Sequence, residues 1–145
     1  MKQAQKPFII GHYIPGIDVM IHSCNGNFID HHRAILLSIG FAPITTTDLE
    51  AALAILRVMA VELVIVDGET GIQETQKILK QARSNGHKVP VLVVGHNSDG
   101  EKRRRALELG AADYLDHPAL QDDVVQAILP DRPRPRNSSL GPQPS

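Results

Sequence analysis

Apolar residues along the chain follow two alternating patterns, short continuous runs and longer stretches in which they recur every three or four positions. Short runs that are apolar at every position are typical of strands buried on both faces of a parallel sheet. The longer stretches are typical of helices with one buried face. The runs predict strands over residues 17–21, 41–45, 63–66, 89–94 and 114–115. The stretches predict helices over residues 28–39, 48–59, 71–83, 99–109 and 120–129.

Capping residues support the predicted helix ends. Thr47 with Glu50, and Ser98 with Glu101, have the spacing of a capping box at a helix start. Gly40 and Gly110 stand where a glycine commonly ends a helix. Five strand–helix units in succession predict an α/β fold, a doubly wound five-stranded parallel sheet with helices on both faces, because crossover connections are right-handed.

The 145 residues are enough for one ordinary domain, which we place at residues 17–129. Residues 1–16 form an N-terminal extension whose apolar side chains are expected to pack on the domain edge. Residues 130–145 contain five prolines and one large apolar residue, Leu140. Such a stretch buries too little surface to offset its ordering entropy, so a disordered tail or linker is expected.

Composition narrows the class of protein. A net charge of -1 favours neither nucleic acid nor an acidic membrane as a partner. Cys24 is the only cysteine, which excludes an internal disulfide and is compatible with a reducing compartment. No apolar run reaches the roughly 20 residues needed to span a bilayer, and the first residues do not resemble a signal peptide. A cytoplasmic location is therefore expected.

Polar residues follow the predicted strands at their carboxyl ends, where open parallel sheets collect ligands and reacting groups. These segments are residues 22–25, 67, 95–97 and 116–118. Asp67 directly follows a buried apolar strand, where a carboxylate is costly unless it is solvated or paired. It is either a reacting group or an aspartate that caps a loop or helix, and the spacing leaves both readings open.

Three segments carry a family resemblance: VELVIVD at 61–67, PVLVV at 90–94, and ALELGAADYL at 106–115 followed by Pro118. The stretch SIGF at 38–41 adds to it. On these segments the chain resembles the receiver domains of bacterial two-component response regulators over roughly residues 17–129. The resemblance implies a flavodoxin-like fold and a role in phosphorelay signal transduction.

The resemblance also implies five functional positions, of which one agrees. Asp67 corresponds to the phosphoacceptor. Ser23 and Cys24, with Asn25 beyond, replace the acidic pair that binds magnesium. Gly95 replaces a serine or threonine, and His117, before Pro118, replaces a lysine. Tyr114 stands at the position of an aromatic residue that changes rotamer in the family, and without a hydroxyl at position 95 it would lose its trigger.

We therefore expect an atypical receiver, or pseudo-receiver, that is not an enzyme and acts by protein–protein contact. Magnesium-dependent phosphorylation should be weak or absent, because a hydroxyl and a thiol are poor ligands for a hard cation. Magnesium, weakly bound, is the only cofactor expected. One alternative is a working phosphoacceptor with unusual metal ligation, in which His117 supplies the cation. Another is a metal-binding sensor that uses Cys24, His96 and His117, with Asp67 nearby.

The expected partner is a protein, either a histidine kinase or a downstream signalling protein, and a homodimer is a further option. One candidate partner surface is the basic run Lys102, Arg103, Arg104 and Arg105. The alternative is a solvated helix whose cations pair with residues such as Glu101 and Glu108. His31 and His32 are expected to be a solvated helix start. The chain is either a stand-alone adaptor or a piece of a longer regulator.

Overall fold

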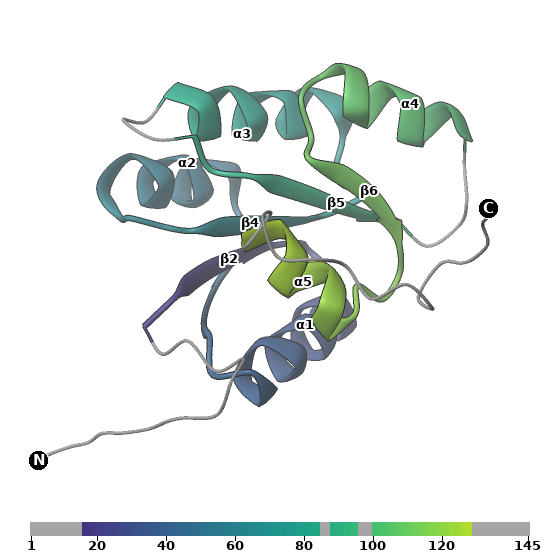
Figure 1. Cartoon of the computed structure of the whole chain (residues 1–145). Coiled ribbons are helices and arrows are strands. Elements are labelled where there is room, and N and C mark those ends of the chain that lie inside the picture. The colour runs from purple at the N-terminus through teal and green to yellow at the C-terminus, as the bar shows by residue number, and fades with distance from the viewer. Residues whose placement is uncertain (1–15, 85–87, 96–99, 129–145) are drawn as a thin grey trace, which may run out of the picture.

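A computed structural model describes residues 16–84, 88–95 and 100–128, and Figure 1 shows their arrangement. The strands are β2 (Asp18–His22), β3 (Ala42–Thr46), β4 (Leu63–Asp67), β5 (Val91–Gly95) and β6 (Asp113–Asp116). The helices are α1 (Gly26–Ser38), α2 (Leu49–Val58), α3 (Ile72–Ser84), α4 (Gly100–Glu108) and α5 (Gln121–Ile128). The predicted N-terminal extension up to residue 15, the tail after residue 129, the Ser98 cap and His96 lie outside the described residues.

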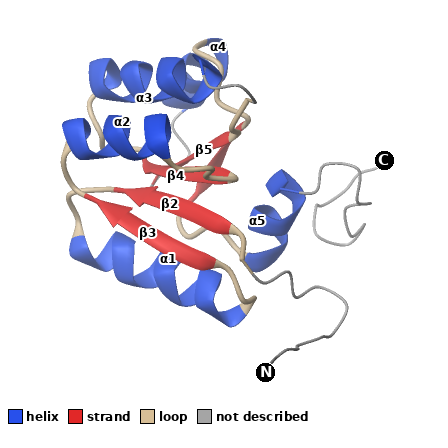
Figure 2. Ribbon diagram, turned by 90° about the vertical axis from the view of Figure 1, so that its left-hand side faces the viewer, coloured by secondary structure: helices blue, strands red, loops and turns tan. Residues whose placement is uncertain are grey.

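The strands form one parallel sheet in the order β3-β2-β4-β5-β6. Helices α2, α3 and α4 cover one face, and α1 and α5 cover the other, as Figures 1 and 2 show. This architecture confirms the fold predicted from the alternating pattern. None of the described helices is both long and apolar enough to cross a membrane.

The central strand β4 supplies side chains to both halves of the core. Val64 and Val66 pack with the α2–α3–α4 layer, whereas Leu63 and Ile65 pack with α1 and α5. All four are fully buried. Successive side chains of a strand point to opposite faces, so a strand covered on both sides has no polar position until it ends. Its first polar residue is Asp67, at the carboxyl edge of the sheet.

Several element ends differ from the prediction. Strand β5 begins at Val91 because Pro90, which has no N–H to donate, contributes only its carbonyl, to the amide of Val64. Helix α2 is capped by Asp48 and not by Thr47, since the carboxylate of Asp48 accepts the Ala51 amide at 3.0 Å.

The two glycine signals are confirmed. Gly40 and Gly110 have φ values of 84° and 112°, the left-handed conformation that ends a helix.

Candidate functional site

Asp67 ends β4 and is only 3% exposed. The parallel register pairs His22 with Val66, so the next residue of that segment, Ser23, comes level with Asp67. The Ser23 hydroxyl donates to Oδ2 of Asp67 at 2.7 Å, and the Glu69 amide donates to Oδ1 at 2.9 Å. Both carboxylate oxygens therefore accept a hydrogen bond from the protein itself.

Ser23 is held in place by its own backbone contacts. It is fully buried, and its amide donates to the Thr46 carbonyl at 3.1 Å. Its hydroxyl oxygen accepts the Asn25 amide at 2.9 Å. A hydroxyl has one proton, and the short bond to Asp67 uses it. Ser23 is thus a fixed hydrogen-bond donor to the Asp67 carboxylate.

The other two predicted pocket residues on this loop have different roles. Asn25 is the N-cap of α1, and its Oδ1 accepts the amides of Asn27 at 2.9 Å and Phe28 at 3.3 Å. Cys24 is exposed, and its thiol donates to the Thr47 carbonyl at 3.4 Å. Of the three, only Ser23 is brought against Asp67 by a hydrogen bond.

Gly95 ends β5, and the ring of Tyr114 lies directly against it. A Cβ added at Gly95 would lie 2.7 Å from Cζ of Tyr114 and would overlap its hydroxyl oxygen. Tyr114 itself is 3% exposed. A Cβ on Gly68 would in turn lie 2.9 Å from the Cα of Gly95, so the two loops meet backbone to backbone. The phenol of Tyr114 fills the volume that a side chain at position 95 would need.

His117 packs its half-buried ring against α1, and its peptide bond to Pro118 is cis. The centroid of this ring lies 5.6 Å from that of Phe28, 5.4 Å from His31 and 5.3 Å from His32. The histidine at the position of the family's lysine therefore belongs to an aromatic cluster formed by two separate segments.

His32 was expected at a solvated helix start, and that prediction is wrong because the side chain is fully buried. Its Nδ1 lies 2.8 Å from the Phe28 carbonyl and donates to it, while Nε2 accepts the Ala119 amide at 3.2 Å. This pattern requires the neutral imidazole with its proton on Nδ1. Burial lowers the pKa of His32 to about 4, and the nearby His117 and His31 act in the same direction. The uncharged ring connects α1 to the start of α5.

We expect acidification from about pH 6.5 to pH 4 to lower the free energy of unfolding through His32. The unfolded chain takes up the proton at the ordinary pKa of 6.5, whereas the folded chain resists it down to about 4. Stability from this group is therefore complete above pH 6.5 and is lost as the pH falls. Urea unfolding at several pH values should show a smaller slope for His32→Gln than for the wild type. His31→Gln removes only a minor contribution to the shift and should keep most of the wild-type slope; equal slopes for all three chains would contradict the assignment.

A second buried histidine, His22, was not singled out from the sequence. Its Nδ1 lies 2.8 Å from the Thr46 hydroxyl and its Nε2 lies 2.9 Å from a carboxylate oxygen of Glu74. These contacts join β2, β3 and the first turn of α3. The only available signal was a histidine at the end of an apolar run, and its partners lie 24 and 52 residues away.

No group of three or more histidine, cysteine, aspartate or glutamate side chains that could hold a metal ion is found in residues 16–84, 88–95 and 100–128. His96, which the metal-sensor alternative requires, lies outside those ranges. Cys24 and His117 make the contacts described above, to the Thr47 carbonyl and to the rings of α1. The geometry therefore does not favour a metal-sensing site.

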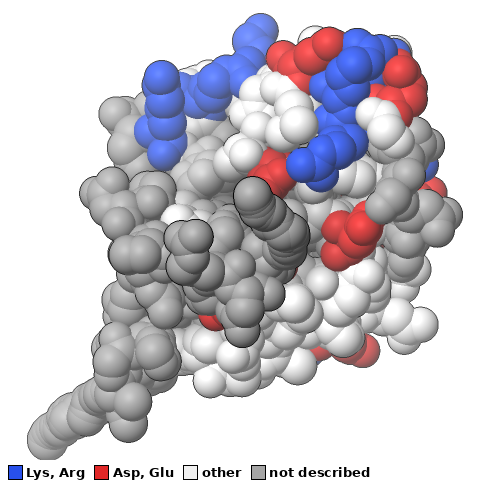
Figure 3. All heavy atoms as spheres, turned by 45° about the vertical axis from the view of Figure 1, so that its right-hand side comes forward, with Lys and Arg blue, Asp and Glu red and all other residues white. Residues whose placement is uncertain are grey.

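The basic run of α4 is largely paired within the domain. Arg104 makes ion pairs with Glu101 and Glu108, as expected for a solvated helix. Arg103 lies 3.7 Å from the carboxylate of Asp113 and donates to the Tyr114 carbonyl. Figure 3 shows basic and acidic side chains intermingled on the side of the molecule that carries this helix. The run is therefore not a uniform basic patch.

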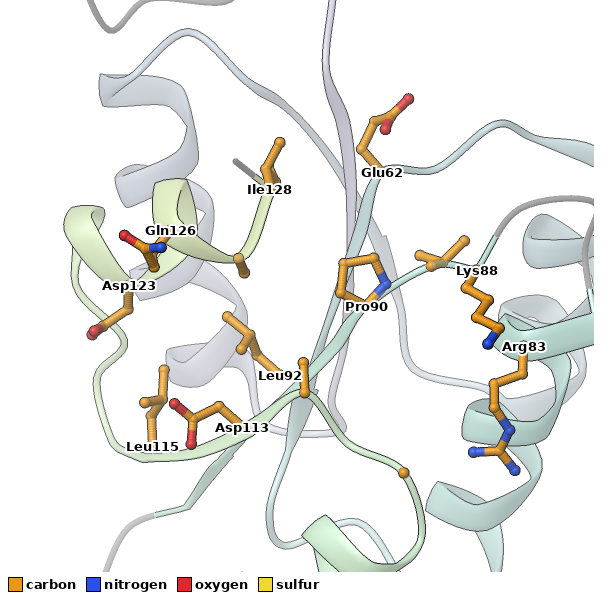
Figure 4. A pocket seen from close by; sticks show the side chains of 14 residues that line it. Glu62, Arg83, Lys88, Pro90, Leu92, Asp113, Leu115, Asp123, Gln126 and Ile128 are labelled. Carbon is orange, nitrogen blue, oxygen red and sulfur yellow. The ribbon is translucent and has the colours of Figure 1, made fainter. Parts of the chain in front are cut away.

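A cavity of about 770 Å³ lies toward the amino ends of β4, β5 and β6. Pro90 and Leu92 lie at its centre in Figure 4, with Glu62, Lys88 and Arg83 toward one side and Asp123 and Gln126 on the other. Asp67, Ser23 and Gly95 do not line it. It is thus separate from the buried Asp67 carboxylate, which lies at the carboxyl end of β4.

Comparisons with known proteins agree with this geometry. A sequence model of the response regulator receiver domain matches residues 27–129. A probable C4-dicarboxylate response regulator of Priestia megaterium is 36% identical over 67 residues, which is 46% of this chain and 29% of that protein. The chain thus spans less than a third of the length of this relative.

Solved structures show the same fold. A response regulator from Thermotoga maritima has a TM-score of 0.66 at 22% identity, covering 79% of this chain and 95% of that one. A response regulator from Burkholderia pseudomallei, described with a phosphorylated aspartic acid, has a TM-score of 0.65 at 18% identity, covering 77% and 66%. Together with the domain match and the aspartate at the end of the third strand along the chain, these findings show that the chain belongs to the response regulator receiver domain family.

Proposed function

We propose that this receiver domain serves two-component signalling through protein–protein contact and does not depend on magnesium-dependent phosphorylation of Asp67. The observation that carries the proposal is the state of the Asp67 carboxylate. Ser23 and Glu69 donate to its two oxygens, and the side chain is almost completely buried. An incoming phosphoryl group would have to break at least one of these bonds, each worth about 1.5–3 kcal/mol for a charged acceptor.

Charge neutralisation at Asp67 also favours this proposal. Aspartyl phosphorylation places negative charge on phosphoryl oxygens, which metal ions and cationic side chains normally neutralise. Magnesium requires oxygen ligands in near-octahedral geometry and dehydrates reluctantly. Here Ser23 offers a neutral hydroxyl, and the exposed thiol of Cys24 donates a hydrogen bond to a backbone carbonyl. Asp67 as the single carboxylate ligand would bind magnesium weakly.

The conformation of Tyr114 supports the phosphorylation-independent part of the proposal. Because Gly95 has no side chain, the ring of Tyr114 occupies the buried space beside it. No hydroxyl at position 95 is available to link a phosphoryl group to this ring. In this proposal the inward ring does not depend on a phosphoryl group, so a protein partner binds the surface around it with or without phosphorylation. A histidine kinase or a downstream regulator is the proposed class of partner.

Incubation with acetyl phosphate and magnesium tests the proposal. We expect intact-mass measurement to show no stoichiometric addition of a phosphoryl group to the wild-type chain. Asp67→Asn is the matched control, since it keeps the size and polarity of the side chain but cannot form the acyl phosphate. Rapid stoichiometric labelling that Asp67→Asn abolishes would contradict the proposal and would favour a working phosphoacceptor.

A further inference from the structure

A second cavity, of about 410 Å³, lies between helix α4 and the loop that follows Asp67, residues 68–72. Its inner wall is formed by buried side chains of α3, β5 and β6, namely Thr75, Val93 and Tyr114. Its outer wall on α4 includes Lys102, Arg105 and Ala106. The cavity thus contacts both the loop that follows Asp67 and the inward ring of Tyr114.

The sequence explains why this space is not filled. Ala106 is the only buried residue of α4, and its methyl group is too short to fill the space toward the sheet. The facing loop contains Gly68 and Gly71, which have no side chains to place in the gap. Ile72 stands at the cavity with 42% of its surface exposed, although it is a large apolar residue. The site therefore offers apolar surface that residues 16–84, 88–95 and 100–128 leave uncovered.

The four basic side chains of α4 lie on different sides of the helix. Lys102 and Arg105 are three residues apart and share the side that faces the cavity, whereas Arg103 and Arg104 make their ion pairs elsewhere. Lys102 lies 3.5 Å from a carboxylate oxygen of Glu69 on the loop that follows Asp67. The Arg105 side chain makes no hydrogen bond or ion pair with any described residue. Two cations and one carboxylate therefore border the cavity.

We propose that this cavity docks a segment of a partner protein in which a large apolar side chain stands next to a carboxylate. The apolar side chain would pack on Ile72, Val93 and Tyr114, and the carboxylate would accept from Arg105. Arg105 is a suitable anchor because a guanidinium pairs with a carboxylate through two parallel hydrogen bonds. This inference rests on the proposed function, in which the domain works by protein contact. It adds the place of that contact and the kind of partner segment that binds there.

Selection from a random 12-residue peptide display library against the whole chain tests the docking proposal. We expect the selected peptides to combine Asp or Glu with a large apolar residue. When such a peptide binds, the amide chemical shifts of the protein should change at residues 68–72 and 102–106. Arg105→Gln should weaken their binding about tenfold, the value of one charge-assisted hydrogen bond. Arg104→Gln removes the same charge from the same helix and should leave binding within about twofold, because surface ion pairs contribute little.

A second pair of variants tests the apolar contact. Ile72→Ser should weaken the selected peptides, while Leu120→Ser, at a 61% exposed apolar residue that does not line this cavity, should not. Failure to select peptides, a consensus without a carboxylate, or equal effects of Arg104→Gln and Arg105→Gln would overturn the proposal. Inorganic phosphate producing the same shift changes would identify a simple anion site and overturn it as well. None of these results alters the labelling of Asp67, so the docking site and the proposed function fail separately.

Discussion

Replacement of Gly95 by serine is expected to drive the Tyr114 ring out of its buried position and to lower the free energy of unfolding by about 2–3 kcal/mol. The new Cβ would lie 2.7 Å from Cζ of Tyr114, well inside van der Waals contact. The neighbouring backbone cannot yield easily, because Gly68 is packed against Gly95 on the other side. The ring must therefore move, and it exchanges a buried site for a solvated one.

Urea unfolding and the exposure of the Tyr114 ring, measured by nuclear magnetic resonance, test this expectation. Gly71→Ser is the matched control, since a Cβ at Gly71 meets nothing within 4 Å. It should change the free energy of unfolding by no more than about 0.5 kcal/mol. A double-mutant cycle with Tyr114→Ala should show that Gly95→Ser costs much less once the ring is absent. Equal stability of Gly95→Ser and Gly71→Ser would mean that the ring and position 95 do not compete for one space.

Replacement of Ser23 and Cys24 together by aspartate is expected to create the magnesium site that the chain lacks. Without magnesium the double variant should be less stable than the wild type, because Ser23→Asp places a second carboxylate against Asp67. Magnesium at about 100 times its dissociation constant should restore about 2.7 kcal/mol. Labelling of Asp67 by acetyl phosphate should accelerate about 100-fold or more, the usual gain from one well-placed electrostatic stabiliser.

Thermal unfolding with and without magnesium measures the first effect, and intact mass over time measures the second. Ser23→Asn with Cys24→Asn provides side chains of similar size without charge and should respond to magnesium no more than the wild type. A wild-type chain stabilised by magnesium as strongly as the double aspartate variant would contradict the interpretation that Ser23 and Cys24 remove the metal site.

The fold could be predicted because its signals are local. Strands β4 and β5 are apolar on both faces, and that pattern indicates a sheet covered by helices on both sides. The glycines at 40 and 110 mark helix ends through a backbone conformation that few other residues adopt. The same pattern predicts Asp67 at the sheet edge, because the first polar residue after a buried strand lies where the strand ends.

The site could be predicted only in part because its contacts are not local. Ser23 and Asp67 lie 44 residues apart, and only the register of two strands brings the hydroxyl to the carboxylate. Cys24 adjoins Ser23 in the sequence, yet it points to Thr47. The fit of Tyr114 against Gly95 depends on the shape of two strand ends, which no residue pattern encodes. The sorting of the α4 cations likewise depends on where acidic partners on β6 and on the loop that follows Asp67 come to lie.

We propose above all that the surface around Tyr114 keeps its conformation without a phosphoryl group on Asp67. The most direct test is the amide nitrogen-15 spectrum of the whole chain in magnesium, before and after addition of beryllium fluoride, which mimics an aspartyl phosphoryl group. We predict that the signals of Gly95 and Tyr114 stay where they are. Coupled shifts at Asp67, Gly95 and Tyr114 that disappear in Asp67→Asn would contradict the claim.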